Sequence, residues 1–214
     1  MADTQTVTIP YESLDPLTIG ASDNKSLVHR DQLELEIPSH NLLGVVAPNE
    51  PAAVANVTET ARAALEDPHS GPRFSELIGP DKSVAIIIDN QFRPTPAAKI
   101  LPTVLDAIEN AGVSDARVIC ANAKVFHMSE SEIEQKIGTD NLARMAALGI
   151  PFYQNEPSDS ERYIFIGMSS RGTPVWLHKE VAKCDVSLSI GQTQSNHWGA
   201  GGGGKLVMPG VVAG

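Results

Sequence analysis

Between residues 83 and 190, short apolar runs alternate with segments of helical spacing, and this alternation restricts the fold more than any other feature of the sequence. The run Val84-Ala85-Ile86-Ile87-Ile88 contains no polar residue, as is typical of a strand that is buried on both faces of a parallel sheet. We expect further strands at residues 116–121, 163–166 and 186–190. The pattern predicts the α/β class, with a parallel or mixed sheet and flanking helices.

Specific residues mark the helix boundaries between these strands. Apolar side chains from Ile100 to Ile108 recur at helical spacing and end near Gly112, because glycine readily adopts the left-handed conformation that closes a helix. Ser129 and Glu132 form a capping box, which predicts a helix that begins there. We expect the other helices at residues 51–66, 140–148 and 178–184.

The N-terminal part of the chain has a different pattern. Apolar and polar residues alternate at 5–12 and 32–38, which predicts two strands of a small β-rich segment. We interpret residues 1–214 as one domain whose core spans residues 80–214. Residues 209–214 are apolar and glycine-rich, and because domains rarely end in this way we expect the sequence to be part of a longer protein.

Charge and composition exclude several classes of function. The net charge is −10 and the isoelectric point is near 5.0, which argues against the clustered Lys and Arg that nucleic acid or an anionic membrane requires. No apolar run approaches the roughly 20 residues of a membrane span, and the N-terminus lacks a signal-peptide pattern. We therefore expect a cytoplasmic protein that binds neither nucleic acid nor membrane, with Cys120 and Cys184 as buried free thiols.

Three polar loops, at residues 89–96, 122–128 and 192–205, each follow the carboxyl end of an expected core strand. In open α/β sheets, ligands bind outside these strand ends. Polar residues in the three loops are therefore better site candidates than polar residues elsewhere.

The first loop contains Asp89, Asn90, Arg93 and Thr95. Prolines on both sides of Thr95 stiffen the loop, so Arg93 could be held ready for a carboxylate or a phosphate. The structural alternative is an ion pair between Arg93 and Asp89.

The second loop contains Lys124 and His127. A histidine at a strand end is a candidate general base, although a solvated or structural role is the alternative. Four further histidines lack such a position, and we interpret them as surface residues: His29, His40, His69 and His178.

The third loop ends in four consecutive glycines, Gly201, Gly202, Gly203 and Gly204, followed by Lys205. It is not a Walker A motif, because Leu206 stands where that motif has Ser or Thr. It is not a dinucleotide fingerprint either, because no helix is predicted after it to receive a pyrophosphate. A lysine at the end of such a loop can supply a charge for a phosphate or an amine for covalent chemistry.

Taken in order, these segments resemble the N-terminal domain of the nickel-dependent lactate racemase family. The family pattern is an Asp-x-Thr-Arg-Pro-x-Pro loop, a histidine before Thr-x-x-Glu, a Gly-Thr-Pro-Val segment, and finally a histidine, a glycine-rich stretch, a lysine and a Leu-Pro-Gly turn. The counterparts here are Arg93-Pro94-Thr95-Pro96, Met128-Ser129-Glu130-Ser131-Glu132, Gly172-Thr173-Pro174-Val175 and residues 199–210. The resemblance covers roughly residues 60–214, and its motifs are specific as to family but not as to substrate.

The resemblance implies a racemase or epimerase of a small 2-hydroxy acid that works by proton-coupled hydride transfer. It also implies a cofactor, the nickel-pincer nucleotide (pyridinium-3,5-bisthiocarboxylic acid mononucleotide nickel), joined covalently to Lys205. The residues expected to bind the cofactor or an anionic group are Lys205, Arg93, Asp89, Asn90, Thr95, Gly201, Gly202, Gly203 and Gly204. The catalytic candidates are His127, His197 and Lys124. The family's nickel-binding histidine and its C-terminal domain would lie beyond Gly214, so we expect this chain to be inactive alone.

The sequence departs from the family pattern in the loops that carry the acid–base pair. Asn90-Gln91-Phe92-Arg93 replaces Asp-x-Thr-Arg, and Val125 and Ser195 stand where the two catalytic histidines are expected. Two alternatives to the racemase stay open. One is a non-catalytic nucleotide- or anion-binding domain of the same fold, and the other is a related oxidoreductase or isomerase that does not use nickel.

Overall fold

The computed structural model describes residues 3–14, 28–46, 52–124, 126–196, 199–201 and 203–213. The side chains of residues 10–14, 28–31, 194–196 and 199–201 lie outside that description. The chain divides into two compact units, Met1–Ala55 and Asn56–Gly214. The interpretation of residues 1–214 as one domain stays a prediction.

The first unit is an antiparallel hairpin of β1 (Thr4–Leu14) and β2 (Val28–Pro38), followed by the short helix η1 (Ser39–Asn41). Val7 pairs with Leu35 and Ile9 pairs with Leu33, so the apolar side chains gather on one face, as the two-residue period of a strand requires. The small β-rich segment predicted from the sequence is therefore confirmed, with strands longer than expected.

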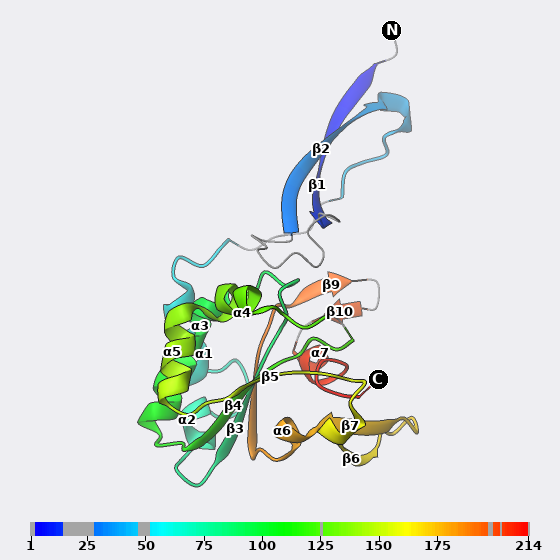
Figure 1. Ribbon diagram of the computed structural model, residues 1–214. Helices are drawn as coiled ribbons and strands as arrows, with labels where there is room; N and C mark the ends of the chain where they lie inside the picture. The colour runs from blue at the N-terminus through cyan, green and yellow to red at the C-terminus, as the bar shows by residue number, and fades with distance from the viewer. Residues whose placement is uncertain are drawn as a thin grey trace. The chain divides into compact units, whose positions relative to one another are not determined.

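The second unit is built on a parallel four-stranded sheet in the order β5-β4-β3-β8 (Figure 1). Its strands are β3 (Ser83–Ile88), β4 (Asp115–Cys120), β5 (Phe152–Gln154) and β8 (Val186–Ile190). The apolar run in β3 is fully buried because a neighbouring strand lies on each side and side chains pack on both faces. The predicted α/β class is confirmed.

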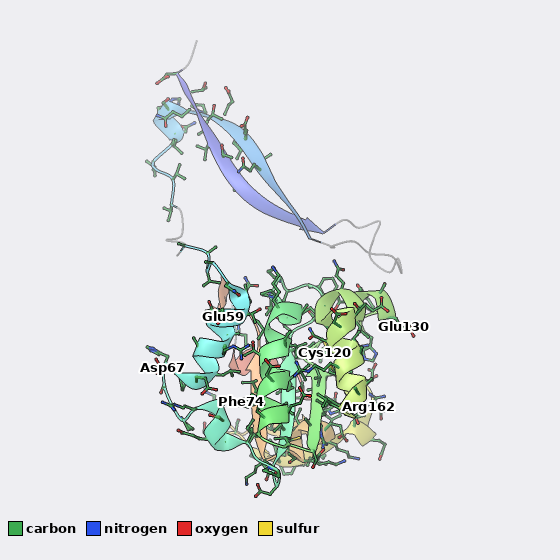
Figure 2. The ribbon with its side chains drawn as sticks, turned by 90° about the vertical axis from the view of Figure 1, so that its left-hand side faces the viewer. Glu59, Asp67, Phe74, Cys120, Glu130 and Arg162 are labelled. Carbon is green, nitrogen blue, oxygen red and sulfur yellow. The ribbon has the colours of Figure 1, made fainter. Side chains whose placement is uncertain are left out.

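One face of this sheet is covered by helices (Figures 1 and 2). Val84, Ile86 and Ile88 point into this layer, and Cys120 lies behind the helices in Figure 2. The helices are α1 (Val57–Glu66), α2 (Phe74–Leu77), α3 (Ala97–Asn110), α4 (Glu130–Ile137) and α5 (Thr139–Ala147).

The opposite face carries shorter elements (Figure 1). Ala85 and Ile87 of β3 pack there against Val181, Leu206 and Val211. The elements on this side and in the adjoining loops are η2 (Ser160–Arg162), β6 (Tyr163–Met168), β7 (Pro174–His178), α6 (Lys179–Ala182), β9 (Gln194–Asn196), β10 (Gly199–Gly201) and α7 (Gly204–Val207).

Two predictions about helices were wrong. The helix expected at 51–66 begins only at Val57, because the Asn56 side chain accepts hydrogen bonds from the N–H groups of Thr58 and Glu59 and caps the helix there. A one-turn helix, α7, does follow the glycine loop, although none was predicted, and it ends before Pro209.

The prediction of buried free thiols is confirmed for Cys120 but was wrong about the burial of Cys184. Cys120 and Cys184 are both free thiols, Cys120 fully buried and Cys184 half-buried. Over the described residues, every helix is too short or too polar to cross a lipid bilayer.

Candidate functional site

The three polar loops lie at one edge of the sheet. β4 and β8 both pair with β3 in parallel, so the carboxyl ends of all three strands, at Cys120, Ile88 and Ile190, meet there. The sequence prediction that these loops share one edge is confirmed by the strand order.

The loop after β3 is held by a buried ion pair. Lys136 of α4 places its Nζ 2.6 Å from Asp89 Oδ1, and both side chains are more than nine-tenths buried. The same ammonium donates hydrogen bonds to the carbonyl oxygens of Arg93 (2.9 Å) and Thr95 (3.3 Å). Thr95 Oγ1 donates to the other carboxylate oxygen of Asp89. We call this assembly the Lys136 clamp.

The candidate site residues in this loop differ in how they are held in the structure. The ion pair considered between Arg93 and Asp89 was wrong, because Lys136 occupies that position and the Arg93 side chain is exposed. Asn90 is buried, and its Oδ1 accepts a hydrogen bond from the N–H of Phe92 (3.2 Å). Asp89, Asn90 and Thr95 thus shape the loop, while the Arg93 side chain is exposed to solvent; binding by any of them stays a prediction.

The loop after β4 is held by a network of neutral groups. Asn155, which follows β5, is fully buried, and its N–H donates to Asn122 Oδ1 while Asn122 Nδ2 donates to its carbonyl oxygen, both at 2.9 Å. Asn155 Nδ2 donates to the carbonyl oxygens of Ala123 (3.2 Å) and Val212 (3.4 Å), and Asn155 Oδ1 accepts from the Tyr163 hydroxyl (2.9 Å). We call this assembly the Asn155 network.

His127 lies beside this network, in an open cleft of about 520 Å³ that Lys124 and Phe126 also line. Its Nε2 is 3.0 Å from the Asn155 carbonyl oxygen and 3.3 Å from Glu156 Oε2. The hydrogen bond from the Ser158 side chain, above all, lowers the pKa of Glu156, so this carboxyl is ionised. The cleft therefore combines two cationic or basic side chains with one carboxylate.

The loop after β8 leads to Lys205, which is half-buried in the first turn of α7. Gly203 has φ +45, a left-handed conformation that suits glycine, and no atom lies within 4 Å of where a Cβ would be on Gly203 or Gly204. The chain thus leaves open space immediately before Lys205.

Hydrogen bonds join the Lys205 segment to the loop that carries Lys124 and His127. Gly210 N–H donates to the Lys205 carbonyl oxygen, and Ala123 N–H donates to the Gly210 carbonyl oxygen, both at 3.1 Å. A Cβ on Gly210 would lie 2.1 Å from the carbonyl oxygen of Leu206, so only glycine allows this close approach, which follows a cis Met208–Pro209 bond.

The chain after this turn pairs with β7. His178 N–H donates to the Val211 carbonyl oxygen and Ala213 N–H donates to the Trp176 carbonyl oxygen, both at 2.9 Å. His178, interpreted as a surface residue, is instead 2% exposed because this segment and Tyr163 cover it, so that interpretation was wrong. Burial lowers the pKa of His178 to about 4.

Some candidates cannot be placed. His197 and Gly202 lie outside the described residues, and Gly201 is described only as backbone in β10. The expectations for these three residues stay predictions.

Several residues that build the site were not predicted. Asn155 follows the carboxyl end of β5, a strand that was not predicted, so the rule that selected the three loops did not reach it. Lys136 lies inside a helix, and nothing in its local sequence indicates a buried charge.

The described residues are compatible with a lysine anchor for a cofactor and do not include a side-chain cluster for a bare metal ion. Among these residues there is no group of three or more His, Cys, Asp or Glu side chains that could hold a metal ion. Lys205, with the open space at Gly203 and Gly204 before it, fits a covalent anchor.

Three comparisons with known proteins agree with this architecture. The family model of the lactate racemase N-terminal domain matches residues 28–214. A lactate racemase from Thermoanaerobacterium thermosaccharolyticum is 25% identical over 189 residues, which cover 86% of this chain and 43% of that protein.

Two solved structures share the fold. The lactate racemase apoprotein from the same organism superposes with a TM-score of 0.72 at 22% identity, over 85% of this chain and 42% of that chain. A protein from Thermotoga maritima superposes with a TM-score of 0.59 at 19% identity, over 73% of this chain and 38% of that chain. This chain thus spans less than half the length of the relatives that it matches.

Proposed function

The chain belongs to the lactate racemase N-terminal domain family, and from this premise we propose that it forms the cofactor- and base-bearing domain of a 2-hydroxy acid racemase or epimerase. The observation that carries the proposal is the pair of hydrogen bonds that ties the Lys205 segment to the loop of Lys124 and His127 through Gly210. They join the half-buried Lys205 and a candidate base in one framework.

We propose that Lys205 holds the nickel-pincer nucleotide through a thioamide bond. When bound, this group would supply the acceptor for the α-hydride of the substrate and return the hydride to either face of the keto acid. The four glycines before Lys205 would let the backbone approach the nucleotide closely, because they carry no side chains.

The chain's own residues would do the proton transfer and hold the anion. His127 would take the hydroxyl proton of the substrate as a general base, and a second base, His197, would serve the other enantiomer. The exposed cations Arg93 and Lys124 would bind the carboxylate of the substrate or the phosphate of the cofactor. We place this reaction in the cytoplasm.

The test is a pair of variants produced in cells that make the cofactor. Lys205→Ala should lose bound nickel and nucleotide, whereas Lys99→Ala, which removes an exposed lysine of α3, should keep both. Nickel is measured by elemental analysis and turnover by chiral separation of a panel of 2-hydroxy acids. Full nickel content and turnover in Lys205→Ala would overturn the proposal.

One observation favours a second candidate function. Val125 and Ser195 stand where the resemblance expects the catalytic histidines, which suits a non-catalytic domain that binds a nucleotide or another anion. Tight binding of a mononucleotide by calorimetry, without turnover of any 2-hydroxy acid by the cofactor-loaded protein, would favour this function over the racemase. Turnover that survives removal of nickel would instead favour an oxidoreductase or isomerase that does not use the metal.

A further inference from the structure

The His127 ring has hydrogen-bond acceptors at only one of its two nitrogens. Nε2 lies 3.0 Å from the Asn155 carbonyl oxygen and 3.3 Å from Glu156 Oε2. Within the described residues, Nδ1 takes part in no hydrogen bond. A carbonyl oxygen and an ionised carboxylate can only accept, so the proton of a neutral imidazole must lie on Nε2.

Both acceptors are themselves fixed in place. Asn155 is fully buried and bonded at its N–H, its carbonyl oxygen and its side chain, so its position does not depend on His127. In Glu156, Oε1 accepts hydrogen bonds from the N–H and the hydroxyl of Ser158, which leaves Oε2 to face His127. The two carboxylate oxygens therefore have separate partners.

We propose that Glu156 is a positioning residue that holds His127 as the Nε2–H tautomer, so that Nδ1 is the atom that takes the substrate's hydroxyl proton. This inference rests on the proposed function for the role of Nδ1. In that step the O–H bond of the substrate breaks, an N–H bond forms at Nδ1, and the α-hydride leaves to the hydride acceptor of the proposed reaction.

The negative charge of Glu156 has a second effect in the same step. Proton transfer to Nδ1 turns the ring into an imidazolium, and the carboxylate 3.3 Å from Nε2 offsets the positive charge that develops. The other charged groups are Lys124, which lines the same cleft, and Arg162, whose charge acts on Glu156. The arrangement thus favours the protonated intermediate as well as the correct tautomer.

The tautomer can be read directly by nitrogen-15 NMR of the labelled chain at pH 8, without substrate or cofactor. The spectra of the wild type, Glu156→Ala and Glu161→Ala are compared, with His127 assigned by a His127→Gln variant. Glu161 is an exposed acid of η2 and serves as the matched control.

We expect a protonated Nε2 and an unprotonated Nδ1 on His127 in the wild type and in Glu161→Ala. In Glu156→Ala, the Asn155 carbonyl oxygen remains as the one acceptor described at Nε2, so the Nδ1–H tautomer should be more populated than in the wild type but should not replace the Nε2–H tautomer. A wild-type His127 that is protonated at Nδ1, or a Glu156→Ala spectrum identical to the wild type, would overturn the inference.

A kinetic experiment separates this inference from the proposed function. In the cofactor-loaded enzyme that includes the family's C-terminal domain, Glu156→Gln should lower kcat by at least tenfold with KM changed less than about twofold, because the carboxylate acts on the charge that forms at the ring. An unchanged kcat in an enzyme that racemises its substrate would overturn the role of Glu156 and leave the proposed function intact. Absence of any racemisation by the loaded wild type, assayed with the family's C-terminal domain present, would overturn the proposed function, while the NMR result still decides the tautomer.

Discussion

The Lys136 clamp and the Asn155 network hold neighbouring loops at the same edge of the sheet by opposite means. The clamp joins one buried ammonium to one buried carboxylate and two carbonyl oxygens. The network contains no formal charge and joins the loop after β4, Tyr163 and Val212 through a single amide side chain.

The two assemblies therefore differ in which substitutions destabilise them most. A buried charge without its partner is costly, so the clamp depends on the presence of both ions. A neutral network spreads its free energy over several bonds of modest strength, each of which can be lost with a smaller effect. The clamp holds a loop to a helix, whereas the network holds the segments that carry His127 and Lys205.

The largest effect should follow from breaking the clamp. Lys136→Met leaves Asp89 buried without its counterion and should lower the free energy of unfolding by about 3–5 kcal/mol. Urea unfolding followed by tryptophan fluorescence gives this value. The double variant Asp89→Asn/Lys136→Met should recover much of the loss; a Lys136→Met protein within about 1 kcal/mol of the wild type would contradict the account.

A smaller effect is expected when the network loses its central side chain. Asn155→Ala leaves the Tyr163 hydroxyl and two carbonyl oxygens without their partner and should cost about 2–3 kcal/mol in the same unfolding experiment. Tyr163→Phe, which removes only one of these bonds, should cost about 1 kcal/mol. Equal losses in the two variants would show that Asn155 does not join the segments as described.

The network should also respond to pH, because His178 packs edge-on against Tyr163 with ring centroids 5.6 Å apart. Burial lowers the pKa of His178 to about 4 in the folded protein, while an unfolded histidine has a pKa near 6.5. The unfolded state therefore binds more protons between these values, so the stability from this group is complete above about pH 6.5 and is lost as the pH falls toward 4.

We expect the free energy of unfolding to fall by about 1–2 kcal/mol from pH 7 to pH 5 because of this histidine. His178→Gln cannot titrate there and should show a flatter pH dependence when urea unfolding is repeated at both values. The same slope in the variant and the wild type would assign the pH dependence to other groups.

The smallest effect concerns the two thiols, of which Cys120 lies under the helical layer and Cys184 packs on the opposite face of the sheet. Burial raises the pKa of Cys120 to about 12, and burial also raises the pKa of the half-buried Cys184. Because the thiolate is the reactive form, Cys120 of the native protein should react with a thiol reagent roughly tenfold more slowly than Cys184. Labelling followed by mass spectrometry, with Cys184→Ser as the control, measures both rates; faster labelling of Cys120 would contradict its burial.

Much of the fold could be predicted because burial determines which positions of the sequence are apolar. The run from Val84 to Ile88 has to be apolar throughout, since both of its faces are covered, and Ser129 with Glu132 marks the start of α4 by local hydrogen bonds alone. The position of the three loops followed from the strand pattern in the same way.

The site itself was less accessible to sequence reasoning, because its decisive contacts join distant segments. Lys136 is buried because it meets Asp89 and carbonyl oxygens of the loop after β3, and His178 is buried because residues 211–213 pair with β7 and Tyr163 packs on its ring. The tautomer of His127 depends on Glu156, which follows a different strand. None of these contacts produces a periodic pattern in the amino-acid sequence.

The most direct test of the account is the mass of the proteolytic peptide that contains Lys205, taken from protein made in cells that synthesise the cofactor. The account predicts a nucleotide-sized adduct on Lys205, with nickel present in stoichiometric amount in the intact protein. An unmodified Lys205 in protein from such cells would contradict the proposed function and leave a non-catalytic anion-binding domain as the better description.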